Sequence, residues 1–431
     1  MTAPESGRRG AFLVLAVLVL ANTVNYMDRN VINILLPRIR DHLMLSDTAL
    51  GLLGGAAFTV FYAVAALPVG WAVDRFPRRL ILAGGLVAWS AATFLSGAAA
   101  TFGQLFAARA LTGSGEATAH PCGVSMLGDL FSARRRTIAI AIFQAGVALG
   151  GGIGVILGGQ IEARTDWRTT LMIFALGGAL LVPLVVAIPE PVRGESDRIG
   201  AGARTTTTSG WIATMGKLLG TRTLVLHYAA TVFVMFALQG YVVWMPSFLE
   251  RVRGFDKEAV SNLAGAATLV GGVVGGIIGG WLSDLWYARD RRGRLFLMAA
   301  ASILAIPCML STIVAQGHTV IVAGLVATMI LLIAMFPILS AVIVDLVEPG
   351  DRGTAMAILL LAQTGLGFSL GPLAAGSLSD ATGRLDLGLA VAPAALAVVA
   401  VFGIAASASV RRDIEARDTR TASMTHEGAA R

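Results

Sequence analysis

Charged residues are scarce in this chain. Asp, Glu, Lys and Arg make up 14% of its 431 residues, hydrophobic residues make up 56%, and the mean hydropathy is +0.76. A soluble globular domain carries about 25% charged residues. The low charge therefore excludes an ordinary soluble domain and indicates a protein that crosses a membrane several times.

Cysteines and cofactor signatures are also few or missing. The two cysteines, Cys122 and Cys308, lie inside apolar segments, where cysteine packs as a small hydrophobic residue. No spacing of His, Cys, Asp or Glu suits a metal ion, and no phosphate-binding P-loop is present. We therefore expect no metal site, no cofactor, no enzyme activity and no ATP-driven pumping.

The net charge of +7 does not indicate a nucleic-acid partner, because the basic residues are clustered. Arginines gather at 75–79, 134–136 and 289–294, directly after apolar segments. If both termini are cytoplasmic, these clusters fall on the cytoplasmic side, as the positive-inside rule requires. We expect a multi-pass protein of the plasma (inner) membrane, monomeric in the lipid bilayer, with both termini in the cytoplasm.

Long apolar segments are what the chain has in abundance. A spanning helix needs about 20 mostly apolar residues, and lipid offers no partner for a free backbone group. The segments are too long and too evenly apolar for barrel strands. Twelve of them qualify: 11–36, 48–74, 79–100, 103–129, 136–161, 168–189, 222–249, 258–287, 295–316, 318–346, 353–379 and 386–410. The sequence predicts an all-α membrane protein with twelve transmembrane helices.

One long polar connection divides these helices into two equal sets. Residues 190–221 are rich in Thr, Gly and charge, as in a cytoplasmic linker. We expect an N-terminal six-helix bundle over 1–189 and a C-terminal six-helix bundle over 222–410. The polar residues 411–431 predict a disordered cytoplasmic tail.

The two halves repeat each other. Asp129 and Arg136 recur as Asp345 and Arg352, 216 residues later. Gly70 and Asp74 likewise recur 210 residues later, as Gly280 and Asp284. Matching residues at matching helix ends predict two pseudo-symmetric bundles, the arrangement that transporters use for alternating access.

Four ionisable residues interrupt segments that otherwise read as membrane-spanning: Asp28, Arg29, Arg109 and Glu116. Such residues cost roughly 2.5–3.5 kcal/mol each at a helix centre on insertion scales. Arg109 and Glu116 are seven residues apart and share one helix face. Their presence indicates a water-filled path in which Asp28 and Glu116 carry protons.

The second half has no ionisable residue at mid-membrane, so its cavity wall is expected to be apolar. A charged wall that faces an apolar wall suits a small amphiphilic or anionic substrate. The residues expected to bind it are Arg29, Arg109, Tyr26, Tyr62, Phe143, Gln144, Phe236, Trp244 and Phe336. Packing in the core or at the membrane interface would explain the aromatic members equally well.

The loop at residues 70–79 resembles the signature loop of the major facilitator superfamily, with Pro77 where glycine is usual. This resemblance implies the superfamily fold and a cytoplasmic latch that opens when the protein faces inward. The residues expected in the latch are Asp74, Arg75, Arg78, Arg79, Arg136 and Arg352.

A narrower resemblance joins both halves to the spinster family. Residues 25–29 (Asn-Tyr-Met-Asp-Arg) and 109–117, which contain Arg109, Gly115 and Glu116, are similar to two motifs of that family. Gly371-Pro372 and Ser379-Asp380 resemble it near the end of the chain. The resemblance implies secondary transport of a lysolipid, sphingoid or related amphiphile, coupled to protons.

Three other functions remain open. Symporters of small organic anions such as sugar acids share the Asn-Tyr-x-Asp-Arg and Gly-Glu-Ala motifs, and the same arginines would bind a carboxylate. Efflux of cationic drugs suits acids in an aromatic cavity but leaves the arginines unexplained. A receptor or scaffold that moves no solute belongs to a different class, and solute flux would separate it from the others.

Overall fold

The protein is built from helices that follow the apolar segments. The computed structural model describes residues 5–193, 211–348 and 351–429, and no strand occurs within them. Eleven of the helices are long and apolar enough to cross a membrane. This agrees with the all-α prediction, since a helix satisfies its own backbone groups in lipid.

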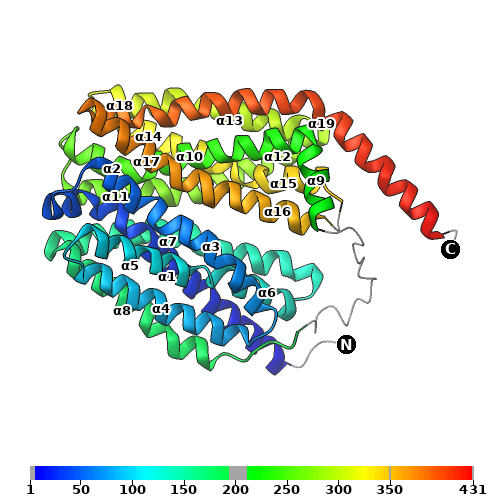
Figure 1. Ribbon diagram of the computed structural model, residues 1–431, viewed down its shortest axis with the longest axis horizontal. Helices are drawn as coiled ribbons and strands as arrows, with labels where there is room; N and C mark the ends of the chain where they lie inside the picture. The colour runs from blue at the N-terminus through cyan, green and yellow to red at the C-terminus, as the bar shows by residue number, and fades with distance from the viewer. Residues whose placement is uncertain (1–4, 194–210, 349–350, 430–431) are drawn as a thin grey trace. The chain divides into compact units, whose positions relative to one another are not determined.

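The first part of the chain, up to the polar linker, contains eight helices (Figure 1): α1 (Glu5–Leu43), α2 (Asp47–Gly54), α3 (Ala56–Val73), α4 (Arg78–Ala98), α5 (Phe102–Glu116), α6 (Ala119–Leu130), α7 (Ala133–Arg164) and α8 (Trp167–Ala187). The expected span 103–129 is not one continuous helix. It is divided into α5 and α6 at Ala117 and Thr118, immediately after Glu116.

The second part contains α9 (Trp211–Gly220), α10 (Arg222–Arg251), α11 (Lys257–Val270), the π-helix η1 (Gly271–Gly275), α12 (Gly276–Arg289), α13 (Gly293–Val314), α14 (His318–Ala334), α15 (Phe336–Leu346), α16 (Arg352–Leu360), the π-helix η2 (Leu361–Gly367), α17 (Phe368–Thr382), α18 (Leu385–Leu389) and α19 (Val391–Ala429). Both π-helices interrupt longer apolar helices. Such interruptions are frequent at functional sites.

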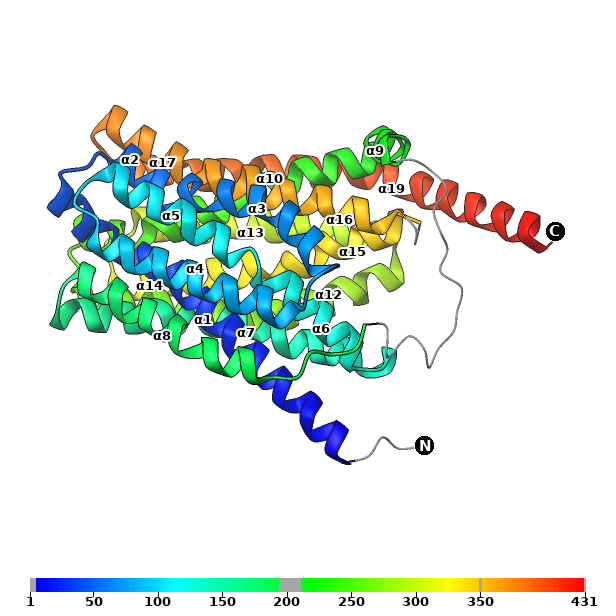
Figure 2. The same ribbon diagram turned by 60° about the horizontal axis from the view of Figure 1, so that its bottom comes forward.

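Two parts of the chain differ from the expected loops. Helix α9 lies within the linker predicted over 190–221, of which 194–210 fall outside the described residues. Helix α19 runs on to Ala429, so the tail expected to be disordered from residue 411 is helical there (Figure 2). Contacts hold the first part of the polar stretch, where Arg411 Nη2 lies 2.9 Å from Asp290 Oδ2 and Arg417 donates to the carbonyl of Asp345.

The chain forms two compact units. Unit 1 comprises 1–203, 242–269 and 376–385, and unit 2 comprises the remaining residues. The expected boundaries of the two six-helix bundles stay a prediction.

Glycine lets two helices of unit 1 approach closely. Helix α7 packs along α1, and the four glycines of α7 spaced four apart all face it. A methyl group on Gly150 would lie 2.2 Å from the carbonyl oxygen of Thr23, and one on Gly154 would lie 2.6 Å from Met27 Cα. Small residues permit such contacts between membrane helices. The contact fixes the part of α1 that carries Asp28.

The apolar core of unit 1 lies against the same helices. Its members come from α1, α4, α6, α7 and α8 and include Leu18, Leu86, Trp89 and Met126, each 1% exposed or less. Side chains packed at this density fix the rotation of each helix. The orientation of polar groups on the inner faces of α1, α4 and α5 follows from that rotation.

Candidate functional site

The four ionisable residues predicted to carry coupling come together in unit 1. They come from α1 and α5, which are far apart in the sequence. Asp28 is 2% exposed, Arg109 is 3% exposed and Glu116 is 0% exposed. Arg29 Nε lies 3.9 Å from Glu116 Oε2, and Arg29 remains 14% exposed at its side chain. Two acids and two bases therefore share one nearly dry site, with Arg29 as the most accessible member.

The two carboxyl groups of this site face one another. Neither oxygen of Glu116 accepts a hydrogen bond from a donor in the described part of the chain, and Asp28 Oδ1 accepts none either. Two ionised carboxylates that are buried beside one another repel each other. A pair that shares one proton is stabilised, because only one of its members is charged. The geometry therefore suits a site whose proton content changes.

An aromatic box holds the two arginines. The guanidinium carbon of Arg29 lies 4.4 Å from the ring centre of Phe58, 4.7 Å from that of Tyr62 and 5.3 Å from that of Tyr26. Arg109 lies 5.1 Å from the ring centre of the same Phe58. Cation–π contacts of this kind stabilise a guanidinium away from water. Arg29, Arg109, Tyr26 and Tyr62 were all predicted site residues.

Phe58 and Thr93 complete the site, and sequence analysis missed both. Phe58 stacks on Tyr62 with ring centres 5.8 Å apart. Thr93 Oγ1 donates a hydrogen bond to Asp28 Oδ2 at 2.6 Å. Phe58 lies on α3 and Thr93 lies on α4. Both are uncharged and belong to no motif that would distinguish them from residues that pack the core. For Phe58 the sequence held an indirect signal, the small residue Gly113 four positions after Arg109. Gly113 lets the backbone of α5 approach Phe58.

The other predicted substrate residues lie elsewhere. Phe143 is buried beside His120, Gln144 is exposed, and Trp244 is fully buried against Gly376. Phe236 and Phe336 belong to unit 2, where Phe236 contacts Phe233 and Phe336 is 38% exposed. Contact of these five residues with a substrate stays a prediction.

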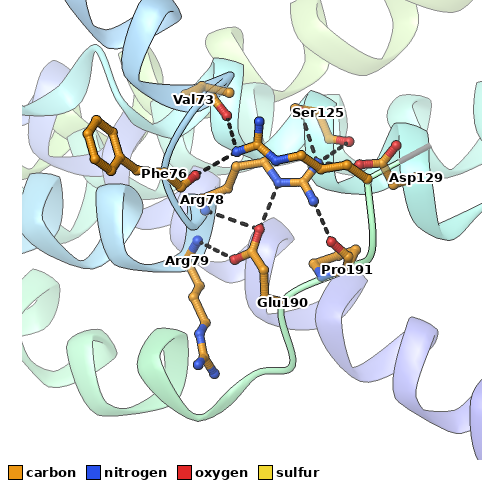
Figure 3. Close-up of polar contacts among 9 residues, drawn as sticks. Val73, Phe76, Arg78, Arg79, Ser125, Asp129, Glu190 and Pro191 are labelled. Atoms are coloured by element: carbon orange, nitrogen blue, oxygen red, sulfur yellow. Dashed lines mark hydrogen bonds and ion pairs between the residues drawn. The ribbon is translucent and has the colours of Figure 1, made fainter. Parts of the chain in front are cut away.

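Two of the arginines predicted for the cytoplasmic latch, Arg78 and Arg79, bind acids and carbonyls within unit 1 (Figure 3). Arg78 binds Asp129, and its Nε donates to Glu190 Oε1 at 2.8 Å. The backbone amides of Arg78 and Arg79 also donate to Glu190, at 3.1 and 3.0 Å. Since Pro77 precedes α4 and offers no side-chain cap, Glu190 caps this helix from 112 residues away.

The remaining latch residues make weaker contacts. Arg75 lies over the ring of Trp71, and Asp74 is exposed, with no hydrogen bond or ion pair to its side chain among the described residues. Arg136 Nε donates to the carbonyl of Phe131 at 3.5 Å, and Arg352 Nε donates to that of Val347 at 3.3 Å. Opening and closing of a latch by these residues stays a prediction.

A second polar cluster of unit 1 was not predicted. Asp47, 3% exposed, accepts hydrogen bonds from Arg251 at 2.8 and 3.2 Å and from Ser379 at 2.6 Å. Asp380 accepts from the backbone amides of Asp47 and Thr48, at 2.9 and 2.7 Å, and so caps the start of α2. These contacts join segments more than 200 residues apart, which no local pattern reveals.

Comparison with known proteins identifies the family. The model of the Major Facilitator Superfamily matches residues 18–358 and 263–427. Spinster homolog 3 of Danio rerio is 31% identical over 88% of this chain and 79% of its own length. The chain belongs to the spinster family of the major facilitator superfamily. It is therefore a membrane transporter and not an enzyme.

Other relatives of this spinster-family protein differ in their named activities. An MFS-type efflux pump of Mycolicibacterium smegmatis is 31% identical over 96% of both chains. The sphingosine-1-phosphate transporter SPNS2 of Mus musculus is 30% identical over 85% of this chain and 69% of its own length.

A solved structure supports the fold. The crystal structure of a bacterial homolog of the human lysosomal transporter Spinster, inward-facing and unoccupied, matches with a TM-score of 0.86 and 24% identity. The match covers 94% of this chain and 98% of that one. The twelve-helix fold of the superfamily accommodates the eleven candidate spans together with the pair α5 and α6.

Proposed function

We propose that this spinster-family transporter couples protons to the movement of an amphiphile with an anionic head group, such as a lysolipid or a sphingoid phosphate. The buried pair of Asp28 and Glu116 carries this proposal. The pair binds one more proton when its cavity opens to the side of lower pH and loses it on the other side. Alternating access then links proton movement to substrate movement.

The arginines supply the affinity for the head group. Arg29 is held by aromatic rings and by a contact of 3.9 Å to Glu116, and its Nη2 atom has no hydrogen-bond partner among the described residues. A phosphate or carboxylate offers Arg29 a stronger, bidentate partner. Substrate binding would then leave Glu116 without its nearest positive charge, which favours protonation of Glu116.

The amphiphile is supported by one relative and by the chemistry of the site. The named substrate of that relative, SPNS2, is sphingosine-1-phosphate, which has an anionic head and a long chain. The anionic head would bind Arg29 and Arg109, two cations held by aromatic rings.

Two alternatives use the same site. A symporter of small organic anions such as sugar acids would use the arginines for a carboxylate. Efflux, here of cationic drugs, is supported by the similarity to the efflux pump of Mycolicibacterium smegmatis, which extends over 96% of both chains. A panel of labelled lipids, sugar acids and drugs, tested for flux into proteoliposomes with and without a pH gradient, separates the three.

The orientation in the membrane is part of the proposal. The basic clusters at 75–79, 134–136 and 289–294 support cytoplasmic termini through the positive-inside rule. We further propose a monomer in the plasma (inner) membrane.

Replacing Glu116 by Gln tests the proton carrier. Glu116→Gln is expected to lose accumulation driven by a pH gradient, at least tenfold relative to the wild type, while exchange of labelled for unlabelled substrate continues. Glu258→Gln, an exposed change of the same chemistry, is the control and is expected to leave both rates unchanged. Accumulation by Glu116→Gln at the wild-type level would refute the role of Glu116.

A further inference from the structure

Thr93 binds the carboxylate of the coupling site from a third helix. Its Oγ1 donates to Asp28 Oδ2 at 2.6 Å, and both residues are 2% exposed. Asp28 comes from α1 and Thr93 from α4, which carries none of the charged members of the site. A hydroxyl that donates to an ionised carboxylate forms a short and strong hydrogen bond.

This hydrogen bond is unusual for a buried threonine in a helix. Such hydroxyls usually donate to a carbonyl three or four residues earlier in the same helix. Thr112 of α5 does so to Ala108 at 3.0 Å, and Ser96 of α4 does so to Ala92 at 3.0 Å. The hydroxyl of Thr93 instead reaches across to another helix.

The contact makes the two oxygens of Asp28 different. Oδ2 is occupied by Thr93, whereas Oδ1 is buried without a hydrogen-bond partner among the described residues. The charged and titratable groups that interact with Asp28 are Arg109 and Glu116 of α5, while Arg29 lies beside Glu116 and over the rings of Tyr26 and Tyr62. From α7, glycines pack against this part of α1. Oδ1 is therefore the oxygen open to a proton.

We propose that Thr93 is a positioning residue for proton coupling, which holds one oxygen of Asp28 and directs the other toward Glu116. This inference rests on the proposed function. Thr93 stabilises the ionised form of Asp28, because a carboxylate oxygen accepts a stronger hydrogen bond at Oδ2 than the carbonyl oxygen of a neutral carboxyl group does. A proton from water that binds Oδ1 converts the carboxylate to a neutral carboxyl group and weakens the contact with Thr93. The hydroxyl can then turn to the carbonyl of Trp89 in its own helix, so that α4 responds to the proton content of the site.

The test measures the pH dependence of gradient-driven uptake in proteoliposomes for Thr93→Val and Thr93→Ser. Valine keeps the shape of threonine but cannot donate, and removal of a hydrogen bond to a charged group is expected to move the pH midpoint upward by about one to two units. Serine keeps the hydroxyl and is expected to retain the wild-type midpoint. The matched control is Thr170→Val in α8, whose hydroxyl donates within its own helix, and it is expected to retain the midpoint as well.

The outcomes separate this inference from the proposed function. A wild-type protein whose uptake does not respond to a pH gradient would refute proton coupling and, with it, the role of Thr93. A responsive wild type together with a Thr93→Val midpoint at the wild-type value would refute the role of Thr93 alone. If Thr93→Val does not fold, Thr93→Ala gives the same test, and an unshifted midpoint in that variant overturns the inference.

Discussion

Phe58 is the side chain that joins the two arginines of the site. Its ring centre lies 4.4 Å from the guanidinium of Arg29 and 5.1 Å from that of Arg109. Two guanidinium groups that contact the same ring repel each other. The negative faces of the ring reduce that repulsion. A single apolar residue therefore allows two cations to stay beside two acids without a fixed ion pair for each.

The contribution of Glu190 to stability depends on pH. Partial burial opposes ionisation of Glu190, but hydrogen bonds from the amide of Arg79 and from Arg78 outweigh it and lower its pKa below the ordinary value. A carboxylate with a lowered pKa stabilises the fold above its unfolded pKa, and that contribution is lost as the pH falls through the folded pKa.

We predict that Glu190→Gln lowers stability at pH 7 and makes it less sensitive to acid. The loss at pH 7 is expected to be about 1 kcal/mol, because the partly exposed ion pair is screened by water. Below about pH 4.3, the ordinary value for Glu, the variant and the wild type should converge. Thermal unfolding in detergent across this range measures the difference, with Glu258→Gln as the control. A constant difference at every pH would contradict the assignment.

At the scale of elements, the division between α5 and α6 is the main departure from regular structure near the site. The helix breaks at Ala117 and Thr118, where Thr118 donates from its Oγ1 and from its amide to the carbonyl of Gly115. Both residues keep right-handed helical dihedral angles, and their amides donate to the carbonyls of Gly113 and Gly115, so the interruption is a local tightening of the helix and not an unwound segment. The break places Glu116 at the end of α5, where a small rotation of α6 can change its surroundings.

Helix α4 supports this break through a close glycine contact. A methyl group on Gly85 would lie 1.9 Å from Thr118 Oγ1 and 2.9 Å from the carbonyl oxygen of Gly115. Gly84, its neighbour on the same helix, has nothing within 4 Å. The two adjacent glycines therefore provide a matched pair for mutation.

We predict that Gly85→Ala destabilises the protein by about 1–3 kcal/mol, because the added methyl group overpacks the break. Gly84→Ala is expected to be neutral or to stabilise by up to about 1 kcal/mol, since alanine favours the helix. Thermal unfolding of both variants, together with uptake, checks the prediction. Equal effects of the two substitutions would show that the close packing at Thr118 is not important.

At the scale of the whole molecule, the internal repeat extends to individual contacts. Arg78 binds Asp129 in unit 1, and Arg294 binds Asp345 in unit 2, each residue 216 positions later. The carbonyls that these arginines also contact, of Ser125 and Ala341, obey the same offset. The break between α14 and α15 at Met335 falls close to the position expected from the break after Glu116. The same arginine contacts therefore stabilise each half of the chain.

The repeats nevertheless differ in their third partner. Arg78 binds Glu190, which has no counterpart at the equivalent place, whereas Arg294 Nη2 binds the exposed Asp284 at 3.1 Å. Asp74 is the repeat of Asp284, and it has no such partner in the described part of the chain. The start of α4 is therefore bound to the polar linker, whereas the start of α13 is bound to the preceding helix α12.

The predicted orientation can be tested by cysteine labelling. In a background without Cys122 and Cys308, Met44→Cys follows α1 and Phe76→Cys follows α3, and both native residues are exposed. If the termini are cytoplasmic, a membrane-impermeant maleimide labels Met44→Cys in intact cells and labels Phe76→Cys only after permeabilisation. The reverse pattern would refute cytoplasmic termini.

The sequence by itself determined the twelve apolar spans and six members of the candidate site, four of them ionisable and two of them tyrosines. Apolar length decides which segments cross a membrane, and ionisable residues within such segments are costly enough to be noticed one by one. The family motifs around Asp28 and Glu116 identified the same residues. The position of the break in 103–129 was not foreseen, because Ala117 and Thr118 are ordinary residues for a helix.

Only the tertiary structure decided that Phe58 and Thr93 belong to the site and which distant residues form pairs. Phe58 and Thr93 gain their roles from the rotation of α3 and α4, which depends on close packing across several helices. Glu190 and Asp380 cap helices that begin more than 100 residues away. Hydropathy and motifs depend on residues near each other in the chain, whereas these contacts depend on helices that meet only after folding.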